Sequence, residues 1–422
     1  MDLIAQYGSM MVLFAGSVGF LTAWGIGAND VANAMGTSVG SKALTIKQAI
    51  IIAMIFEFAG AYLAGGEVTS TIRKGIIDSS FYIDRPELLV YGMTAALLAA
   101  GTWLIIASYF GWPVSTTHSI VGAIVGFSVV GVGANSVEWS KVIGIVGSWV
   151  ITPLISGIIS YKIFMSAQKL IFDTSKPIEN AKKYVPLYMF LAGFIMSLVT
   201  IIKGLKHVGL HFSNLESVGL AIIAGLVVAS VGKLYISRIK IDPSADKKMQ
   251  FANVEKIFAV LMVITACAMA FAHGSNDVAN AIGPLAAVVS IVGSGGEIGA
   301  KAALAWWILP MGGIGIVLGL AIFGKRVMAT IGSGITHLTP SRGFAAELAA
   351  AATVVIASGT GLPISTTQTL VGAVLGVGMA HGIAALNLSV VRNIVISWVI
   401  TLPIGAALSI LFFYMLKGFF SA

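Results

Sequence analysis

Two short polar motifs interrupt an otherwise apolar chain. Residues 27–34 read Gly-Ala-Asn-Asp-Val-Ala-Asn-Ala, and residues 274–281 repeat this motif with Ser275 in place of Ala28. Amides and carboxylates are expensive to place in apolar surroundings unless they hold one another or a ligand. Because the chain carries this cost twice, the motifs predict one shared polar site.

The oxygen atoms of the two motifs suit a hard cation. Amide and carboxylate oxygens are ligands that such a cation prefers. A membrane helix broken at the motif would add backbone carbonyls, as at Na⁺ sites in other transporter folds, so we expect each helix to break there. The predicted Na⁺ ligands are Asn29, Asp30, Asn276 and Asp277. We expect Asn33 and Asn280, three residues beyond each Asp, to support these ligands. The alternative is that each Asn-Asp pair only satisfies unwound backbone.

A second duplicated block has the chemistry of an anion site. Pro-Val-Ser-Thr-Thr at 113–117 and Pro-Ile-Ser-Thr-Thr at 363–367 each follow a glycine and precede an apolar run of helical length. Ser and Thr at such a position cap the new helix, whose free N–H groups and positive dipole end bind oxyanions. The predicted substrate ligands are Ser115, Thr116, Thr117, Ser365, Thr366 and Thr367. Ordinary capping of two helices is the alternative, which the duplication disfavours.

The charges near these blocks indicate that anion and cation bind together. No Lys or Arg occurs in 24–40, 109–126, 271–290 or 358–376, whereas two carboxylates do. Those carboxylates would repel a buried phosphate or sulfate by several kcal/mol. Na⁺ or protons would remove the repulsion, and the mutual dependence would couple the two fluxes. A site for cations alone would contain the same acids.

Two further acids lie inside apolar stretches. Glu57 and Glu347 are candidate cation ligands or proton carriers, because an ionisable residue within a membrane span is functional by default. The alternative for each is a structural hydrogen bond to a neighbouring helix. They are not equivalent between the copies, since Leu97 occupies the place that matches Glu347. His118 and Gln368 do match each other, and we expect both to be hydrogen-bonding neighbours of the site.

Composition places these motifs in a polytopic membrane protein. The chain has 422 residues, of which 57% are hydrophobic and 10% charged, and it contains many apolar runs long enough to cross a bilayer. The net charge of +8 comes mainly from basic residues between those runs, which indicates topology signals and no nucleic-acid partner. A single cysteine, Cys267, excludes an internal disulfide and any multi-cysteine metal site.

Three landmarks recur in the same order and reveal an internal duplication. The Asn-Asp motif, the Pro-x-Ser-Thr-Thr block and a Ser-Trp-Val-Ile-Thr segment at 148–152 reappear 247, 250 and 249 residues later. The predicted organisation is a first transmembrane repeat at 1–165, a linker with two spans and cytoplasmic basic loops at 166–256, and a second repeat at 257–422. An odd number of crossings in each half would invert the repeats. We expect an all-α protein with two inverted repeats, broken helices or re-entrant hairpins, and about twelve spans.

The duplicated Asn-Asp-Val-Ala-Asn-Ala and Pro-x-Ser-Thr-Thr blocks resemble those of the inorganic phosphate transporter family (PiT), which includes sodium–phosphate symporters. The resemblance covers about 20–164 and 258–415. It implies inward transport of inorganic phosphate driven by Na⁺ or by protons, and two inverted repeats with both termini outside. The intramembrane acids and serines that it implies are Asp30, Glu57, Ser115, Asp277, Glu347 and Ser365. The chain lacks the large insertion between halves found in animal members, which concerns regulation.

These observations predict a secondary active transporter that imports phosphate by symport with Na⁺ across the plasma (inner) membrane. Its expected partners are phosphate, Na⁺ or H⁺, the lipid bilayer and a second copy in a homodimer, with no cofactor. H⁺-coupled transport of phosphate or transport of sulfate is the main alternative, and a cation channel or receptor is a weaker one. An enzyme is not expected, because the sequence contains no metal cluster and no nucleophile–base pair beyond the weak neighbours Ser115 and His118.

Overall fold

Helices make up nearly all of the described chain. The computed structural model describes residues 2–203, 205, 209–239, 247–298, 304–331, 337–382 and 387–420. The long helices are α1 (Asp2–Gly40), α2 (Ile46–Ala64), α3 (Gly66–Lys74), α4 (Pro86–Phe110), α5 (Thr116–Gly131), α6 (Trp139–Ala167), α7 (Pro177–Ile202), α8 (Asn214–Ser237), α9 (Lys247–Gly293), α10 (Ile308–Ile331), α11 (Pro340–Gly359), α12 (Thr366–His381) and α13 (Leu388–Phe420). Three short turns are η1 (Ser79–Tyr82), η2 (Ala134–Ser136) and η3 (Gln168–Phe172). Within these residues there is no strand, only one isolated bridge between Ile77 and Val137.

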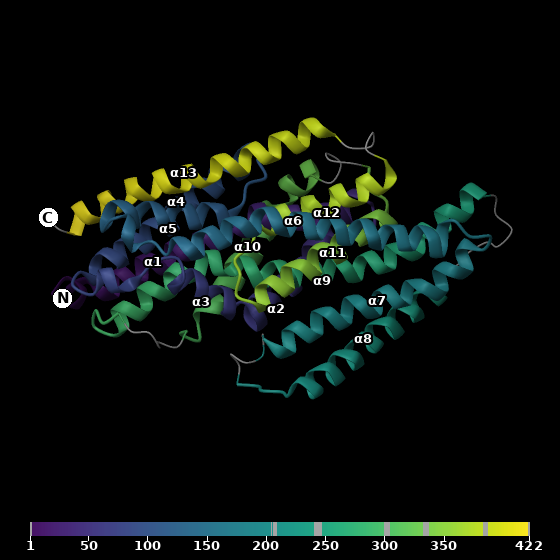
Figure 1. Cartoon of the computed structure of the whole chain (residues 1–422), viewed down its shortest axis with the longest axis horizontal. Helices are drawn as coiled ribbons and strands as arrows, with labels where there is room; N and C mark the ends of the chain where they lie inside the picture. The colour runs from purple at the N-terminus through teal and green to yellow at the C-terminus, as the bar shows by residue number, and fades with distance from the viewer. Residues whose placement is uncertain are drawn as a thin grey trace.

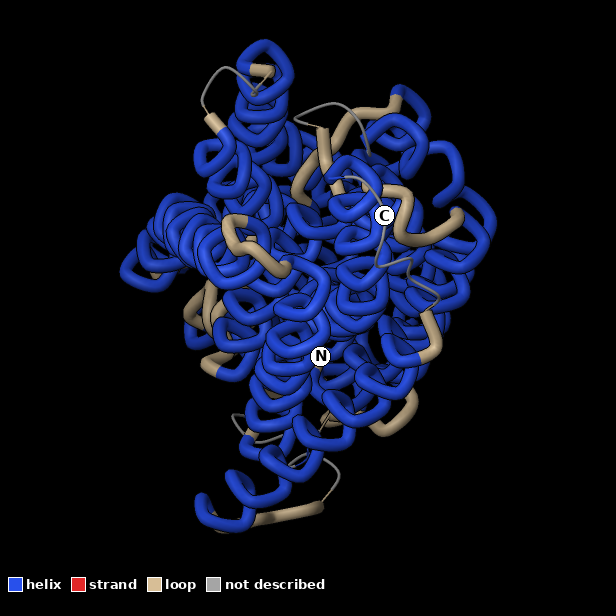
Figure 2. The backbone as a smooth tube through the Cα atoms, turned by 90° about the vertical axis from the view of Figure 1, so that its right-hand side faces the viewer, coloured by secondary structure: helices blue, strands red, loops and turns tan. Residues whose placement is uncertain are grey.

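Most of these helices are built to cross a bilayer. Nine described helices are long and apolar enough to do so, namely α1, α2, α4, α6, α7, α8, α9, α11 and α13. Two more apolar helices, Thr116–Gly131 and Ile308–Gly324, are shorter. Seen along its long axis, the described chain is a bundle of helices joined by loops (Figure 2). The prediction of an all-α polytopic membrane protein is confirmed.

The two Pro-x-Ser-Thr-Thr blocks form the tips of helical hairpins. The first arms, α4 and α11, are followed by Gly111 and Gly361, whose φ angles of 68° and 74° turn the chain through a conformation that glycine adopts without strain. The prolines that follow cannot continue a helix. Figure 1 shows α4 and α5 in the half that holds both termini and α11 and α12 in the other half. The hairpins therefore enter the bundle from opposite ends.

The hairpins occupy the centre of the bundle. In the most apolar 18-residue stretch of each helix, 78% of the α4 residues and 89% of the α11 residues are buried, against 22% in α7 and in α8. The helices α7 and α8 pack on one another at the periphery (Figure 1). The tips meet, because the Thr117 hydroxyl donates to the Ile364 carbonyl at 2.9 Å. The twelve expected spans correspond to α1, α2 and α4 to α13, of which α4, α5, α11 and α12 form the arms of the two hairpins.

Helix packing follows the duplication. α1 packs along α10, and its counterpart α9 packs along α2. Likewise α13 packs on α4 and α5, and its counterpart α6 packs on α11 and α12. Each half therefore interleaves its helices with the other half, and both are needed to enclose the centre.

The predicted helix breaks at the Asn-Asp motifs are wrong, since α1 and α9 run through them without interruption. The physical reason is that neighbouring segments provide acceptors for the amide nitrogens of the motifs. The Asn29 amide donates to the Ser108 hydroxyl and to the Trp112 carbonyl, both at 3.1 Å. The backbone hydrogen bonds of α1 and α9 therefore continue through the motifs. The non-helical backbone near the site lies at the hairpin tips instead.

Two glycines let the motif helices approach their neighbours closely. A Cβ at Gly27 would collide with the Ile316 carbonyl of α10, and one at Gly274 would collide with the Glu57 carbonyl of α2. These contacts make Ile316 and Glu57 counterparts in the two halves. They also fix how near Glu57 lies to the second motif.

Candidate functional site

The first residues of each Asn-Asp motif hold a hairpin in place. Asn29 ties α1 to the end of α4 and to the first tip, as described above. The second copy repeats these contacts: Asn276 Nδ2 donates to Ser358 Oγ at 3.0 Å and to the Leu362 carbonyl at 3.2 Å. The amide nitrogens thus anchor the tips. Asn276 Oδ1 also accepts the Ile364 backbone N–H at 3.3 Å, whereas Asn29 Oδ1 has no donor among the described residues.

Each motif Asp accepts a hydrogen bond from a hairpin threonine. Thr116 Oγ1 donates to Asp30 Oδ2, and Thr366 Oγ1 donates to Asp277 Oδ2 at 2.7 Å. Ser115 and Ser365 cap α5 and α12, and each hydroxyl accepts the backbone N–H three residues later at 3.3 Å. The predicted capping of two new helices inside the membrane is therefore present in both halves.

The predicted site residues meet at one buried place between the tips. Asn280 Nδ2 donates to Thr117 Oγ1 at 3.2 Å, which links α9 to the opposite hairpin. No member of the group is more than 5% exposed: Asn29, Asp30, Ser115, Thr116, Thr117, Asn276, Asp277, Asn280, Ser365, Thr366 and Thr367. The side chain of Asn33 lies outside the described residues. The structure therefore brings together every other predicted ligand of the two duplicated blocks.

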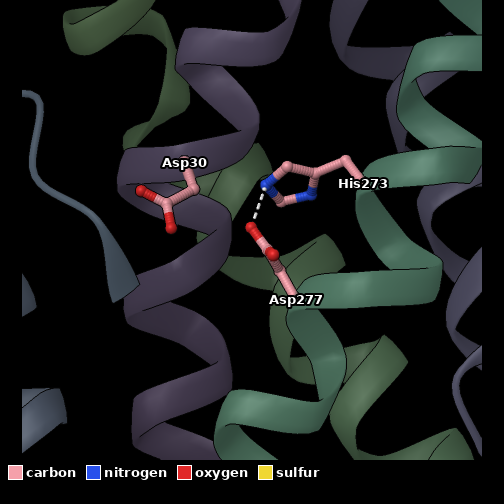
Figure 3. Close-up of side chains that lie close together, drawn as sticks. All are labelled: Asp30, His273 and Asp277. Atoms are coloured by element: carbon pink, nitrogen blue, oxygen red, sulfur yellow. Dashed lines mark ion pairs between the residues drawn. The ribbon is translucent and has the colours of Figure 1, made fainter. Parts of the chain in front are cut away.

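A histidine that the sequence analysis overlooked lies at the centre of this group. The ligand atoms of Asp30, His273 and Asp277 all lie within 4.8 Å of one another (Figure 3). His273 Nε2 is 2.9 Å from Asp277 Oδ2, at ion-pair distance but without the angle of an aligned hydrogen bond. His273 Nδ1 is 2.9 Å from Glu57 Oε2. His273 therefore links Glu57 to the second motif.

His273 changes the charge balance of the site. A carboxylate can only accept, so the ring serves both neighbours only when both nitrogens carry a proton. The count of Lys and Arg missed this ionisable group. A signal was available, because His273 directly precedes the second motif within an apolar run, whereas Ile26 precedes the first. An ionisable residue inside a membrane helix is a site candidate by that position alone.

Glu347 lies in a separate polar cluster. It accepts hydrogen bonds from Thr37 Oγ1 at 2.6 Å, from Ser38 Oγ, and from Thr265 Oγ1 at 2.8 Å. Thr37 and Ser38 follow the first motif on α1, towards the end away from the chain termini. Of the two additional acids, the structure therefore connects Glu57 directly to the central group, and it places Glu347 among hydroxyls between α1, α9 and α11.

His118 and Gln368 contact each other across the two hairpins. His118 Nε2 lies 3.2 Å from Gln368 Oε1, and Nδ1 lies 3.1 Å from the Trp398 carbonyl. The imidazole also stacks on Trp149, with ring centroids 3.8 Å apart. These contacts make the pair a bridge between α5 and α12 just behind their N-terminal caps.

Several oxygens of the central group have no hydrogen-bond donor within the described part of the chain. They are Oδ1 of Asn29, Asp30, Asp277 and Asn280, all buried. Buried oxygens without donors are costly unless a cation or a ligand hydrogen contacts them. Carboxylate and amide oxygens suit a hard cation such as Na⁺, and the helix N-termini opposite them suit an oxyanion. The arrangement can therefore hold ions of both signs.

Comparisons with known proteins agree on one family. The sequence model of the phosphate transporter family matches residues 26–409. A Haemophilus influenzae protein to which phosphate permease activity is ascribed is 58% identical over the whole length of both chains. The chloroplastic inorganic phosphate transporter 2-1 of Arabidopsis thaliana is 43% identical over 93% of this chain and 70% of its own. A solved structure entitled "The sodium-dependent phosphate transporter" has a TM-score of 0.90 and 43% identity, covering 97% of this chain and 99% of that one.

Proposed function

The chain belongs to the phosphate transporter family, and from this premise we propose that it imports inorganic phosphate across the plasma membrane by symport with Na⁺. Phosphate transport, and not enzymatic catalysis, is the activity of the family. One observation supports the finer proposal most strongly: the N-termini of α5 and α12, at two hairpin tips, face two motif carboxylates in a single buried group.

The anion half of the proposal assigns phosphate to the tips. Ser115 to Thr117 and Ser365 to Thr367 begin two helices that start at the same buried place from opposite directions. Their dipoles and N–H groups attract an oxyanion. The hydroxyls of Ser115, Ser365 and Thr367 would add hydrogen bonds, because those of Thr116, Thr117 and Thr366 already donate within the protein. Phosphate at neutral pH also carries a hydrogen that sulfate lacks. The donor-free Oδ1 atoms of Asp30 and Asp277 would accept it, which favours phosphate over sulfate.

The cation half assigns Na⁺ to Asn29, Asp30, Asn276 and Asp277. Three carboxyl groups and one imidazole lie in or beside the central group, so with all four charged the protein would have an excess of negative charge before phosphate arrives. A bound phosphate would be repelled by several kcal/mol at the low effective dielectric of this place. Na⁺ removes the repulsion, and this mutual dependence is the basis of coupling.

The duplicated architecture would supply alternating access. Not counting the hairpins, each half has three crossings, made in the first by α1, α2 with α3, and α6, and in the second by α9, α10 and α13. Three is odd, so residues 1–165 and 257–422 would form inverted repeats around the site, joined by the two spans of 166–256. The basic segments around α7 and α8 would face the cytoplasm, which places both termini outside.

Proton coupling is the second candidate, and one contact favours it. The Glu57–His273 pair is a buried acid–imidazole pair joined to the central Asp277. Such a pair can carry a proton between the two faces. Glu347, held by three hydroxyls, is a second candidate for proton or cation binding.

Uptake of labelled phosphate by liposomes containing the purified protein would test the proposal. Inward gradients of Na⁺ or of H⁺ are imposed separately at clamped voltage, with choline replacing Na⁺ and unlabelled sulfate as competitor. We expect uptake that requires Na⁺ and ignores sulfate. Uptake driven only by the pH gradient would replace Na⁺ by H⁺. Transport of sulfate without phosphate would contradict the substrate assignment.

A further inference from the structure

The short helix α3 lies over the tip of the second hairpin. Thr71 Oγ1 donates to the Gly361 carbonyl at 2.6 Å, and Gly361 is buried. A Cβ at Gly361 would lie 3.2 Å from Thr71 Oγ1 and 3.5 Å from the Glu67 carbonyl. Ser365, the cap of α12, follows Gly361 by four residues. α3 therefore contacts the loop that leads into the predicted substrate residues of the second half.

The first tip lacks such a cover among the described residues. Gly111 occupies the place that matches Gly361, and no described atom comes within 4 Å of a Cβ built on it. Its neighbours Phe110 and Trp112 are 59% and 47% exposed. The two tips therefore differ in this structure: α3 closes the second, and the first is uncovered.

α3 lies on the outer side of the second tip. The second hairpin enters the bundle from the end away from the chain termini, so its tip points towards the end that holds them. Figure 1 shows α3 in the half that holds both termini, the half assigned above to the outer side. An anion that approached the second tip from outside would meet α3 first.

α3 is a nine-residue segment between two glycines. Gly65 is both the C-cap of α2 and the N-cap of α3, and Gly75 is the C-cap of α3. Its buried residues are Val68, Thr69 and Ile72. Segments with a small buried face are the ones that open locally while the rest of a protein stays folded. The glycines give this segment places at which the backbone can turn.

The sequence of this segment occurs twice. Residues 65–75 read Gly-Gly-Glu-Val-Thr-Ser-Thr-Ile-Arg-Lys-Gly, and residues 324–334 read Gly-Lys-Arg-Val-Met-Ala-Thr-Ile-Gly-Ser-Gly, with five identities at an offset of 259. Glu57 and Ile316, which are counterparts by packing, have the same offset. The α3 segment is therefore part of the internal duplication.

The two copies have different backbone arrangements. The helical run is interrupted at Gly65, so that α3 bends away from α2 and over the second tip. The matching Gly324 lies inside α10, which continues without interruption as far as Ile331. The side chains of 325–331 lie outside the described residues. Related sequences thus form a bent and a continuous helix within one molecule, so the continuous form is accessible to this sequence type.

We propose that α3 is an outer lid over the second hairpin tip, with Thr71 as its latch, and that it opens by turning about Gly65 to admit phosphate from outside. The open position resembles α10, with α3 in line with α2. Opening releases the Gly361 carbonyl and uncovers the loop before Ser365. The inference rests on the proposed function for the substrate and for the outer side. A lid that closes one approach while the other is open is what alternating access requires.

The accessibility of a buried cysteine tests the motion. Ile72→Cys is introduced together with Cys267→Ala, which removes the native cysteine, because Ile72 is fully buried beneath α3. Intact cells are treated with a membrane-impermeant methanethiosulfonate. We expect slow modification, made about two- to tenfold faster by Thr71→Val, the factor that loss of one neutral hydrogen bond gives. Ser70→Ala, which changes an exposed hydroxyl of the same helix, is the control and should leave the rate unchanged.

A reversible cross-link tests whether transport needs the motion. A Cβ on Gly283 of α9 would lie 2.7 Å from the Ile72 Cβ, so a disulfide, which spans about 3.8 Å between Cβ atoms, can form after a shift of about 1 Å. In the Cys267→Ala background, Ile72→Cys with Gly283→Cys should lose phosphate uptake on oxidation and regain it with dithiothreitol. Each single cysteine variant should be insensitive to the oxidant.

Each outcome supports or overturns the lid. Equal modification rates in Thr71→Val and Ser70→Ala would overturn the latch, and modification only from the cytoplasmic face of inverted vesicles would overturn the outer position. Uptake that continues with the disulfide formed would overturn the lid. If the double cysteine variant is inactive even when reduced, the modification rates decide. Absence of phosphate uptake by the wild type would overturn the proposed function, while the modification rates would still show whether α3 opens.

Discussion

The two copies of the central motif share their hydrogen bonds and differ in their charges. Asn29 and Asn276 anchor equivalent places on the two hairpins, and Asp30 and Asp277 each accept from the second residue of a Ser-Thr-Thr block. The positions that precede the motifs have diverged, since Ile26 matches His273. By packing, Ile316 likewise matches Glu57. The two copies thus share the hydrogen bonds of the central group, whereas the ionisable residues His273 and Glu57 lie only beside the second motif.

Neutralising either motif Asp should abolish coupled uptake, which would show that both halves serve one site. Asp30→Asn and Asp277→Asn keep shape but remove a charge that attracts a cation 4 Å away by about 4 kcal/mol at an effective dielectric of 20. We expect each to lower uptake at least about 100-fold. The exposed Asp84→Asn is the control and should transport normally. Retained uptake in either variant would mean that only one half binds ions.

Replacing the polar pair beside the second motif, Glu57 and His273, by the apolar residues found beside the first motif tests this difference. His273→Ile alone should destabilise the fold by about 3–5 kcal/mol, because it leaves Glu57 and Asp277 buried without their partner. Glu57→Ile combined with His273→Ile reproduces the surroundings of the first motif, where Ile316 and Ile26 stand, and should recover much of that loss, so the two effects should not add. Thermal unfolding in detergent measures this, and uptake by the double variant should remain low. Normal uptake would show that the pair has no role in transport.

The matched glycines offer a third comparison. Gly27→Ala and Gly274→Ala should each cost about 1–3 kcal/mol in stability, since the new methyl meets a neighbouring carbonyl. Gly274→Ala should impair uptake more, because the helix it displaces carries Glu57. Gly16→Ala, also in α1 but with nothing within 4 Å of its Cβ, is the control. Equal uptake by the two motif variants would contradict the special position of Glu57.

The smallest expected effect concerns the threonines that contact the acids. Thr116→Val and Thr366→Val each remove one hydrogen bond to a charged acceptor, worth about 1.5–3 kcal/mol. Uptake should fall about tenfold or somewhat more, and by a similar factor in both. Initial rates at several phosphate concentrations would measure it. A clear difference between the two variants would mean that the two threonine–aspartate hydrogen bonds contribute unequally to transport.

The sequence predicted most of the central group because its residues lie in short motifs that occur twice. The Asn-Asp and Ser-Thr-Thr blocks carry their chemistry in a few consecutive residues, and their near-constant offset showed that they belong together. The continuity of α1 and α9 was missed because it depends on Ser108, Trp112 and the other tertiary partners of the amides. The Glu57–His273 contact joins residues 216 positions apart, and no spacing within either helix encodes it.

The position of Glu347 in the fold could not be predicted from the sequence either. Its apolar surroundings correctly marked it as an unusual acid, but the three hydroxyls that contact it come from two other helices. A pattern along one helix identifies an embedded acid, and only packing decides whether it faces the centre or a separate cluster.

The most direct test of a shared anion–cation site is the linkage between the two ligands. Phosphate affinity of the purified protein would be measured by equilibrium binding over a range of Na⁺ concentrations at fixed pH, with Na⁺ affinity measured reciprocally over a range of phosphate. We predict that each ligand tightens the other by the same factor. The linkage should be lost in both Asp30→Asn and Asp277→Asn. Phosphate affinity that does not change with Na⁺ in the wild type would contradict the account.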